Sequence, residues 1–234
     1  MTTTYIPAPA APVSGARRPL TVDAELDAPL SRWLWLVKWL LAIPHCVVLS
    51  LLSVAYFVLT VVAMFAILFT GRYPRGIFEF NVGVLRRGWR VAYYSYGSLG
   101  TDRYPPFTLA DVPDYPARLE VAYPEHLSRG LVLVKWWLLA IPHYIVVGIL
   151  LGGYRVAGTP SLGLIGVLVL IAAVALAFTG AYLPEIFDLV IGLNRWVLRV
   201  VAYASLMTDE YPPFRLDLGG HEPGSPVSET SGGS

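Results

Sequence analysis

The chain has a single cysteine, Cys46, and few charged residues. One thiol cannot form an intrachain disulfide and supplies no cysteine cluster for zinc or iron–sulfur chemistry. Charged residues make up 14% of the 234 residues, whereas a soluble domain usually carries about 25%. The 17 Lys and Arg nearly balance the 16 Asp and Glu, so the net charge of +1 gives no broad positive field for nucleic acid. These absences argue against an ordinary soluble globule and against nucleic acid as a partner.

Charged residues are missing from three long stretches, residues 39–71, 136–154 and 156–184. Each stretch is at least as long as the roughly 18 apolar residues expected of a membrane span. A single helix from residue 32 through the first stretch would measure about 58 Å, nearly twice a hydrocarbon core, so we predict a hairpin of two short spans there. A Gly/Pro/Ser-rich connection, 152–161, divides the other two stretches. The sequence therefore predicts four spans, near 32–52, 55–71, 130–152 and 162–180.

The chain repeats itself in three blocks that keep the same order. LVKWLLAIPH (36–45) returns as LVKWWLLAIPH (133–143), FTGRYPRGIF (69–78) as FTGAYLPEIF (178–187), and TDRYPPF (101–107) as TDEYPPF (208–214). A period of roughly 100 residues indicates a duplicated unit rather than a solenoid. The second copy is 11 residues longer between its histidine and its FTG block. We expect two repeats, 20–113 and 114–218, flanked by disordered tails at 1–19 and 219–234.

The positive charges predict an orientation. Sixteen of the 17 Lys and Arg fall on one side of the four-span arrangement, and Arg155 alone falls on the other. The positive-inside rule then predicts a multi-pass protein of the inner (plasma) membrane with both termini in the cytoplasm. Apolar and polar residues alternate over 20–26 and again over 117–123, which is typical of strands and predicts a small cytoplasmic sheet. The expected fold is thus mainly α-helical, with two parallel-repeated hairpins and minor β elements.

The repeated blocks resemble a known family. A basic and aromatic start to the first span, followed by AIPH, FTG-x-Y-P and T-D-x-Y-P-P-F, is similar to the bacterial membrane proteins grouped as domain of unknown function 4389. The resemblance covers both repeats, roughly residues 20–216. It implies a membrane fold and supplies no activity or catalytic residues. The second copy departs from the first at Ala181 and Leu183, which replace Arg72 and Pro74.

Each first block ends in a proline and a histidine, Pro44–His45 and Pro142–His143. A proline inside a helix removes a hydrogen bond, so both prolines predict kinks. Two ionisable groups at membrane depth form a candidate polar pair that could face each other as a proton relay in a small transporter or channel. Alternatively, each imidazole donates to a carbonyl freed by its own proline or packs against a neighbouring helix. Two histidines without a carboxylate are too few for a metal site, so no metal or cofactor is expected.

A second feature follows each apolar region. Glu79, Arg86 and Arg90 lie on one helical stripe, and the spacing recurs in the second repeat with Asp188, Arg195 and Arg199. The opposite stripe is apolar, which predicts an amphipathic helix along the inner membrane surface or packed beneath the spans. The arginines could contact anionic lipid headgroups or an acidic ligand. They could instead pair with the two carboxylates and dock the helix against the other repeat.

The third feature is T-D-x-Y-P-P-F, in which the two prolines enforce an extended segment. An exposed block of this kind could dock in a partner's groove, or it could be a rigid elbow whose aromatic rings pack under the membrane face. No catalytic motif and no phosphate-cradling glycine loop is present. We therefore expect a non-enzymatic scaffold or accessory module that contacts anionic lipid or an unidentified membrane partner, with assembly into oligomers left open. The alternative is the transporter or channel lined by the two histidines.

Overall fold

A two-stranded sheet joins the two repeats. The computed structural model describes residues 19–152, 155–156, 159–160 and 162–221. Strand β1 (Leu20–Ala24) comes from the first repeat and pairs antiparallel with β2 (Ala117–Val121) from the second. Val22 pairs with Leu119, and the register runs symmetrically on either side of this pair. The predicted sheet is confirmed, and a pseudo-twofold axis passes through its centre.

The first repeat contains one long helix and one shorter helix. Helix α1 (Trp35–Thr70) runs through 36 residues without interruption, and α2 (Arg75–Tyr94) returns beside it. The predicted hairpin of spans 32–52 and 55–71 is therefore wrong. Residues 51–55 read LLSVA, and no glycine or proline there ends the helix. The hairpin was predicted because a single helix of this length is too long to cross a bilayer at right angles. Pro44 lies within the continuous helix.

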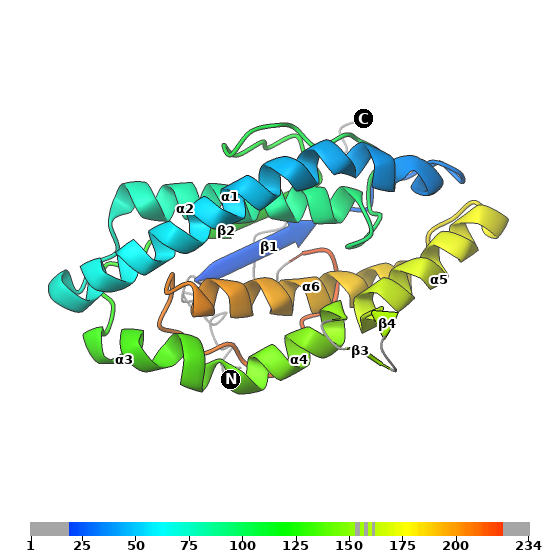
Figure 1. Ribbon diagram of the computed structural model, residues 1–234. Helices are drawn as coiled ribbons and strands as arrows, with labels where there is room; N and C mark the ends of the chain where they lie inside the picture. Colours follow the sequence, from blue (N-terminus) through cyan, green and yellow to red (C-terminus); the bar gives the residue numbers. More distant parts are fainter. Residues whose placement is uncertain (1–18, 153–154, 157–158, 161, 222–234) are drawn as a thin grey trace, which may run out of the picture.

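The second repeat divides the same path into pieces. Its elements are α3 (Arg129–Val134), the π-helix η1 (Lys135–Leu139), α4 (Ile141–Leu151), β3 (Arg155–Val156), β4 (Thr159–Pro160), α5 (Leu164–Thr179) and α6 (Pro184–Ala204). The chain bends by 46° between η1 and α4, beside the predicted kink at Pro142. Figure 1 shows α5 continuing in the general direction of α4 rather than returning beside it. The predicted break at 152–161 is confirmed, and the helices on either side, 129–151 and 164–179, lie close to the predicted spans 130–152 and 162–180. The 11 extra residues thus interrupt the counterpart of α1, but the two helices do not form the predicted hairpin.

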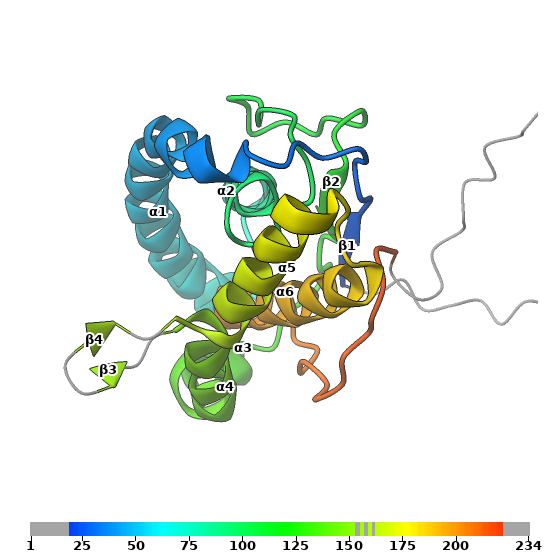
Figure 2. The same cartoon turned by 90° about the vertical axis from the view of Figure 1, so that its right-hand side faces the viewer.

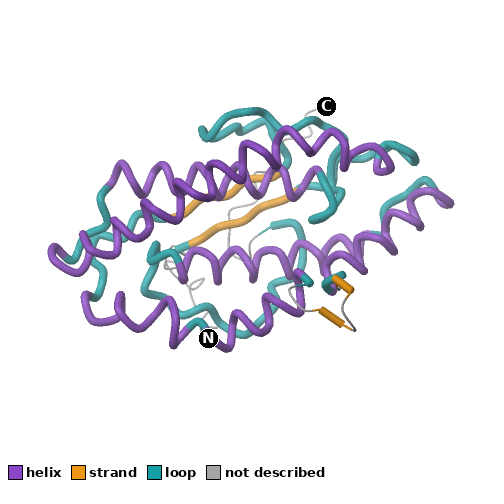
Figure 3. The backbone as a smooth tube through the Cα atoms, in the orientation of Figure 1, coloured by secondary structure: helices purple, strands orange, loops and turns teal. Residues whose placement is uncertain are grey.

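The elements stack in layers. Figure 2, which looks approximately along the helices, shows α1 and α4 on one side, the sheet on the opposite side, and α2 and α6 between them. Figure 3 shows that the long helices and the two strands run lengthwise beside one another. The predicted amphipathic helices are therefore α2 and α6, packed beneath the outer helices. Their buried side chains, including Phe78, Trp89 and Trp196, form much of the core.

The outer helices present apolar side chains that nothing in the described chain covers. From Leu40 to Phe69, α1 exposes a continuous row of aliphatic and aromatic residues, and α4 and α5 do the same. By length and composition, α1 could cross a membrane, and so could the bent pair of 129–139 and 141–151 if it counts as one span. Helix α5 is apolar but shorter. Four separate spans are not present in the described residues.

Both predicted tails fall almost entirely outside the described residues. Of the C-terminal tail, only residues 219–221 are described, and they are held against β1, since the Ala24 amide donates to the Gly220 carbonyl at 2.8 Å.

Candidate functional site: two motif clusters

The first and third repeated blocks meet in space, once in each repeat, beside side chains of the helix that follows the second block. Their side chains form a first cluster and a second cluster at equivalent positions. The first cluster consists of Lys38, His45, Arg87, Tyr94, Asp102, Tyr104 and Phe107, and the second of Lys135, His143, Trp196, Tyr203, Asp209, Tyr211 and Phe214. Arg87 in the first cluster and Trp196 in the second occupy matching helix positions. This is the main difference between them.

A buried lysine and an aspartate form the first half of each cluster. The Lys38 ammonium lies 2.9 Å from the Asp102 carboxylate and donates to the Thr101 carbonyl at 2.7 Å. Lys135 repeats both contacts with Asp209 and Thr208, each at 2.6 Å. Both lysine side chains are almost fully buried, and both aspartates remain partly exposed. The T-D of each third block therefore anchors the lysine of the first block.

The same aspartates also hold the start of the outer helices. Asp102 accepts from the Ser31 amide at 2.5 Å, and Asp209 accepts from the Ser128 amide at 2.7 Å. A carboxylate at a helix N-terminus satisfies amides that have no partner within the helix. Below each lysine lies a tyrosine ring 5.0 Å from the ammonium, Tyr94 or Tyr203. Burial raises the pKa of both phenols, so they stay neutral beside the lysine.

The histidine and the Y-P-P-F aromatics form the second half. His45 is fully buried, with its ring stacked 4.0 Å from Phe107 and 4.8 Å from Tyr104. His143 lies 4.5 Å from Phe214 and 4.6 Å from Tyr211, and its Nε2 is 3.2 Å from the Pro212 carbonyl. Each histidine is thus enclosed by the aromatic block of its own repeat. The structure does not bring the two together as the predicted facing pair.

A π-helix keeps the second cluster in register. Lysine and histidine are seven residues apart in the first repeat and eight in the second, because the second carries an extra tryptophan. Seven residues make about two α-helical turns and place both side chains on one face, whereas eight would place them about 80° apart. The extra residue falls within η1, Lys135–Leu139, whose wider turn absorbs it. Lys135 and His143 therefore face the same aromatic block.

A strained leucine precedes each T-D. Leu99 and Leu206 occupy equivalent positions and have φ angles of 54° and 66°. Such values are uncommon for residues other than glycine and cost roughly 1–3 kcal/mol. Both side chains are buried in the core, which compensates for the backbone conformation. The reversed turn at this leucine directs the aspartate back toward the lysine.

The predicted arginine stripe turns inward. The Arg86 Nε donates to the Leu119 carbonyl at 3.1 Å, and its equivalent Arg195 donates to the Val22 carbonyl at 3.0 Å. Leu119 and Val22 are the central pair of the sheet, so each arginine holds the strand of the other repeat. Arg195 also donates to the carbonyls of residues 217, 219 and 220. These guanidinium groups are engaged by internal acceptors and do not point outward to lipid.

The second pair of arginines also has internal partners. Arg90 is buried and donates to the carbonyls of Thr108 and Ala110, and Arg199 pairs with Asp217 at 2.7 Å. The predicted ion pairs of these arginines with Glu79 and Asp188 are not formed in the described part of the chain. Glu79 is exposed and Asp188 is half-buried. Glu79 lies two helical turns from Arg86, about 10 Å along the axis, which is too far for contact.

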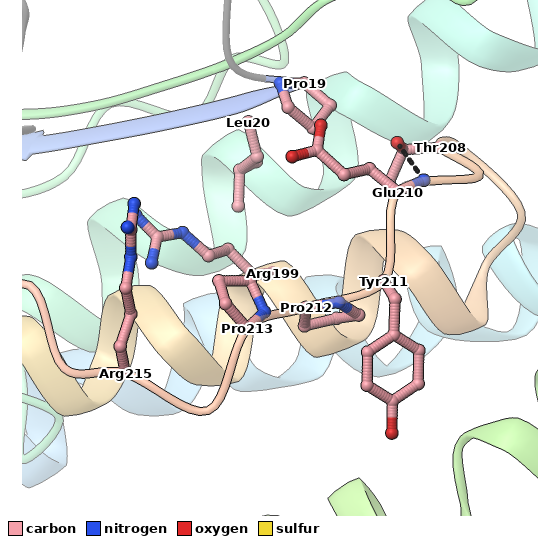
Figure 4. A pocket seen from close by; sticks show the side chains of 9 residues that line it. All are labelled: Pro19, Leu20, Arg199, Thr208, Glu210, Tyr211, Pro212, Pro213 and Arg215. Carbon is pink, nitrogen blue, oxygen red and sulfur yellow. Dashed lines mark hydrogen bonds between the residues drawn. The ribbon is translucent and has the colours of Figure 1, made fainter.

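A small open cavity of about 60 Å³ lies beside Arg199. Figure 4 shows Arg199 and Arg215 side by side at one end of the cavity, with Glu210 and Thr208 at the other. Both arginines share Asp217, at 2.7 and 3.4 Å. Their charge is therefore largely met within the protein. Among the described residues no three metal-ligating side chains come together.

Sequence reasoning missed the residues that join the blocks: Lys38, Lys135, Asp102, Asp209 and Arg87. All but Arg87 lie inside the repeated blocks, so the duplication itself marked them. Considered separately, each block has a sufficient local explanation as a helix or an elbow. Their contact across 63 to 74 residues of chain appears only in the fold.

Comparison with known proteins agrees with the duplicated arrangement. A family model described as Domain of unknown function (DUF4389) matches the chain twice, over residues 32–108 and 133–215. Each match contains one complete first block and one complete third block, so each covers one cluster. No curated protein and no solved structure matches the chain. The two matches cover more than half of the sequence, and the chain belongs to the family of domain of unknown function DUF4389, in two tandem copies.

Proposed function

We propose that this chain is a non-enzymatic scaffold or accessory module of the bacterial inner membrane, embedded through its outer helices. The observation that carries the proposal is the uncovered apolar surface of α1. Its exposed side chains between Leu40 and Phe69 include no charged residue. A soluble monomer rarely exposes an apolar patch larger than a few hundred Å², and this one extends along some 30 residues of helix. Lipid is the solvent that suits such a surface.

The opposite side of the molecule supports a particular orientation. The outer face of the sheet carries Thr21, Asp23, Arg118 and Glu120, and the last two are exposed. The strands run in roughly the same direction as α1, on the far side of α2 and α6 (Figures 2 and 3). If α1 stood upright in the bilayer, these charged side chains and the open strand edges would lie at membrane depth, where neither is tolerated. We therefore propose that α1 lies in the plane of the membrane, within one leaflet.

The length of α1 points the same way. Its 36 residues measure about 54 Å, against a hydrocarbon core of about 30 Å. An upright α1 would leave roughly ten apolar residues beyond the core at one end. Lying flat, the helix immerses its whole apolar side. The tryptophans near its start, exposed Trp33 and Trp39, suit the headgroup region.

The positive charges are compatible with this arrangement. If α1 lies in the plane of the membrane, the sheet, the two T-D-x-Y-P-P-F blocks and both termini lie on the cytoplasmic side. The sixteen Lys and Arg residues that the positive-inside rule assigns to the cytoplasm then stay on that side. The multi-pass arrangement expected from the sequence is the alternative. It would require α1 and the bent α3–α4 segment to cross the bilayer, carrying α2 and its arginines with them.

A depth profile along α1 tests the orientation. Single cysteines placed at Leu40, Val47, Val54, Val61 and Phe69, in a Cys46→Ser background, carry a nitroxide label in vesicles. Accessibility to oxygen against a polar nickel complex reports the depth of each label. An in-plane helix gives a flat profile, because all five exposed positions lie at similar depth. A spanning helix gives a profile that is deepest in the middle.

A cysteine at Arg118 on the sheet serves as the matched control and should report water in vesicles of any composition. A profile with its maximum near Val54 would overturn the in-plane arrangement while leaving membrane embedding intact. Water accessibility at all five positions would overturn the membrane proposal itself.

A further inference from the structure

The first cluster contains a buried arginine without an anionic or carbonyl acceptor. Only 3% of Arg87 is exposed. Its contacts in the described residues are the Nδ1 of His45, 3.4 Å from its Nη2, and the Phe107 ring, 4.8 Å from its Cζ. Within the described part of the chain its Nε has no hydrogen-bond partner. The equally buried Arg90 and Arg195 donate to two and four carbonyls respectively.

An arginine cannot escape this situation by losing its proton, because its guanidinium stays charged in proteins. A buried charge without a partner costs several kcal/mol. The neighbouring His45 does not supply a negative charge. If its Nδ1 accepts from Arg87, the proton lies on Nε2, which also has no partner. Two side chains that touch each other therefore each keep an unused N–H donor.

The second cluster differs from the first in its charge. Trp196 takes the place of Arg87 and stacks 5.4 Å from His143, whose Nε2 reaches the Pro212 carbonyl and whose Nδ1 has no partner among the described residues. Lys135 and Asp209 balance each other, so the second cluster is neutral. In the first cluster Lys38 and Asp102 balance in the same way, and Arg87 adds an uncompensated positive charge. The difference in charge lies at one residue.

The cover of the first cluster is only partly buried. Phe107 is 54% exposed and Tyr104 is 45% exposed, and the Tyr104 hydroxyl donates to the Leu41 carbonyl at 3.3 Å. Phe107 touches both His45 and Arg87 from the outer side. When this ring swings away, the two unused donors face the space that it leaves.

We propose that the first cluster binds a phosphate group at Arg87 and His45, beneath the Tyr104–Phe107 cover, and that the second cluster does not. A guanidinium and an imidazole N–H suit a tetrahedral oxyanion, which would supply the missing charge. The phosphate can belong to a lipid headgroup or be inorganic phosphate. The lipid source rests on the proposed membrane function, whereas the free source does not.

Thermal unfolding tests the site. The full chain in maltoside micelles is titrated with inorganic phosphate at constant ionic strength. In a second arm it is placed in vesicles of phosphate-free digalactosyl diacylglycerol, with or without phosphatidylglycerol. Binding to the native state should raise the unfolding midpoint by about 5 °C at saturation in at least one arm. A response in micelles identifies free phosphate, and a response in vesicles alone identifies the lipid headgroup.

Arg87→Trp copies the second cluster and should abolish the rise. In phosphate-free micelles its midpoint should be no lower than that of the wild type, because the buried charge is gone. Arg118→Gln removes an exposed charge from the sheet and should respond as the wild type does. Arg87→Gln replaces the tryptophan variant if that variant does not fold. An unchanged wild-type midpoint in both arms, or an Arg87 variant that responds fully, would overturn the site. The depth profile of α1 is unaffected by either result.

Discussion

At the scale of single residues, most buried cations of this protein are satisfied by backbone carbonyls or by aspartate. Lys38 and Lys135 each combine a carboxylate with a carbonyl, and Arg195 gathers carbonyls from β1 and from the C-terminal segment. A guanidinium that bridges several carbonyls ties together segments that share no regular secondary structure. The arginines of α2 and α6 are thus part of the framework.

The equivalent arginines 86 and 195 should differ in their contribution to stability. Arg195→Gln leaves several buried carbonyls without a donor and should lower the free energy of unfolding by about 3 kcal/mol. Arg86→Gln removes one carbonyl contact and a 3.7 Å ion pair at a partly exposed position and should cost about 1 kcal/mol. Urea unfolding in micelles measures both, with exposed Arg118→Gln as the control. Equal losses would contradict the assignment of Arg195 as the greater anchor.

At the scale of elements, the two repeats reach one arrangement by different helices. In the first, α1 is continuous, whereas in the second η1, a bend and an inserted segment divide the path. Gly71 and Gly180 end these paths in the left-handed region, at φ angles of 72° and 76°. A left-handed backbone favours glycine at both positions, because a Cβ there is strained.

Removing the extra tryptophan tests the role of η1. Deletion of Trp137 makes the second block identical to the first and should turn the π-helix into an α-helix with Lys135 and His143 still on one face. The unfolding midpoint should stay within about 3 °C of the wild type, since a change of roughly 1 kcal/mol shifts it by that much.

Deletion of Leu40 in the first repeat is the matched control. It shortens the spacing between Lys38 and His45 to six residues and places them about 120° apart around the helix, so one of the two contacts must break. That variant should lose much of its folded population in micelles, as followed by circular dichroism. If the two deletions prove equally harmful, η1 is not a register correction.

At the scale of the whole molecule, the repeats exchange contacts across the pseudo-twofold axis. Each strand pairs with the strand of the other repeat, and each of Arg86 and Arg195 binds a carbonyl of the strand that the other repeat supplies. Further hydrogen bonds cross the same boundary, from Tyr182 to the Ser98 carbonyl at 2.7 Å and from Asn194 to the Gly97 carbonyl at 2.9 Å. The predicted repeats are units of sequence that complete each other's core.

Splitting the chain between residues 113 and 114 should separate the repeats without creating two stable domains. Neither fragment alone pairs its strand, and each loses the strand carbonyl that its arginine binds in the other repeat, so each should unfold or self-associate. Co-expressed, the fragments should purify together through a tag on one of them. Arg195→Gln in the second fragment should reduce this recovery. If fragment 1–113 alone is monomeric and unfolds cooperatively, the repeats do not depend on each other's contacts, and the prediction is contradicted.

Several features of the fold were predictable because they depend on local pattern. The alternation at 20–26 and 117–123 predicted the strands, and the stripe containing Arg86 and Arg90 predicted α2. The continuous helix α1 was not predictable from the usual length of a membrane span. That length applies only to a helix that crosses the bilayer upright. The predicted ion pairs of Glu79 and Asp188 are not formed. The spacing of residues along a helix shows which of them share a face, but it does not show which groups of the protein pack against that face.

The sequence by itself determined the duplication, the apolar character of the outer helices and the family, because each depends on residue order and composition alone. Only the tertiary structure decided which blocks touch, where the arginines point and which buried cation lacks a partner. Those outcomes depend on contacts between residues from 18 to 173 positions apart, whose partners are chosen by packing and by the need to satisfy buried polar groups. Two nearly identical sets of blocks therefore yield one neutral cluster and one positively charged cluster, distinguished by Arg87 and Trp196.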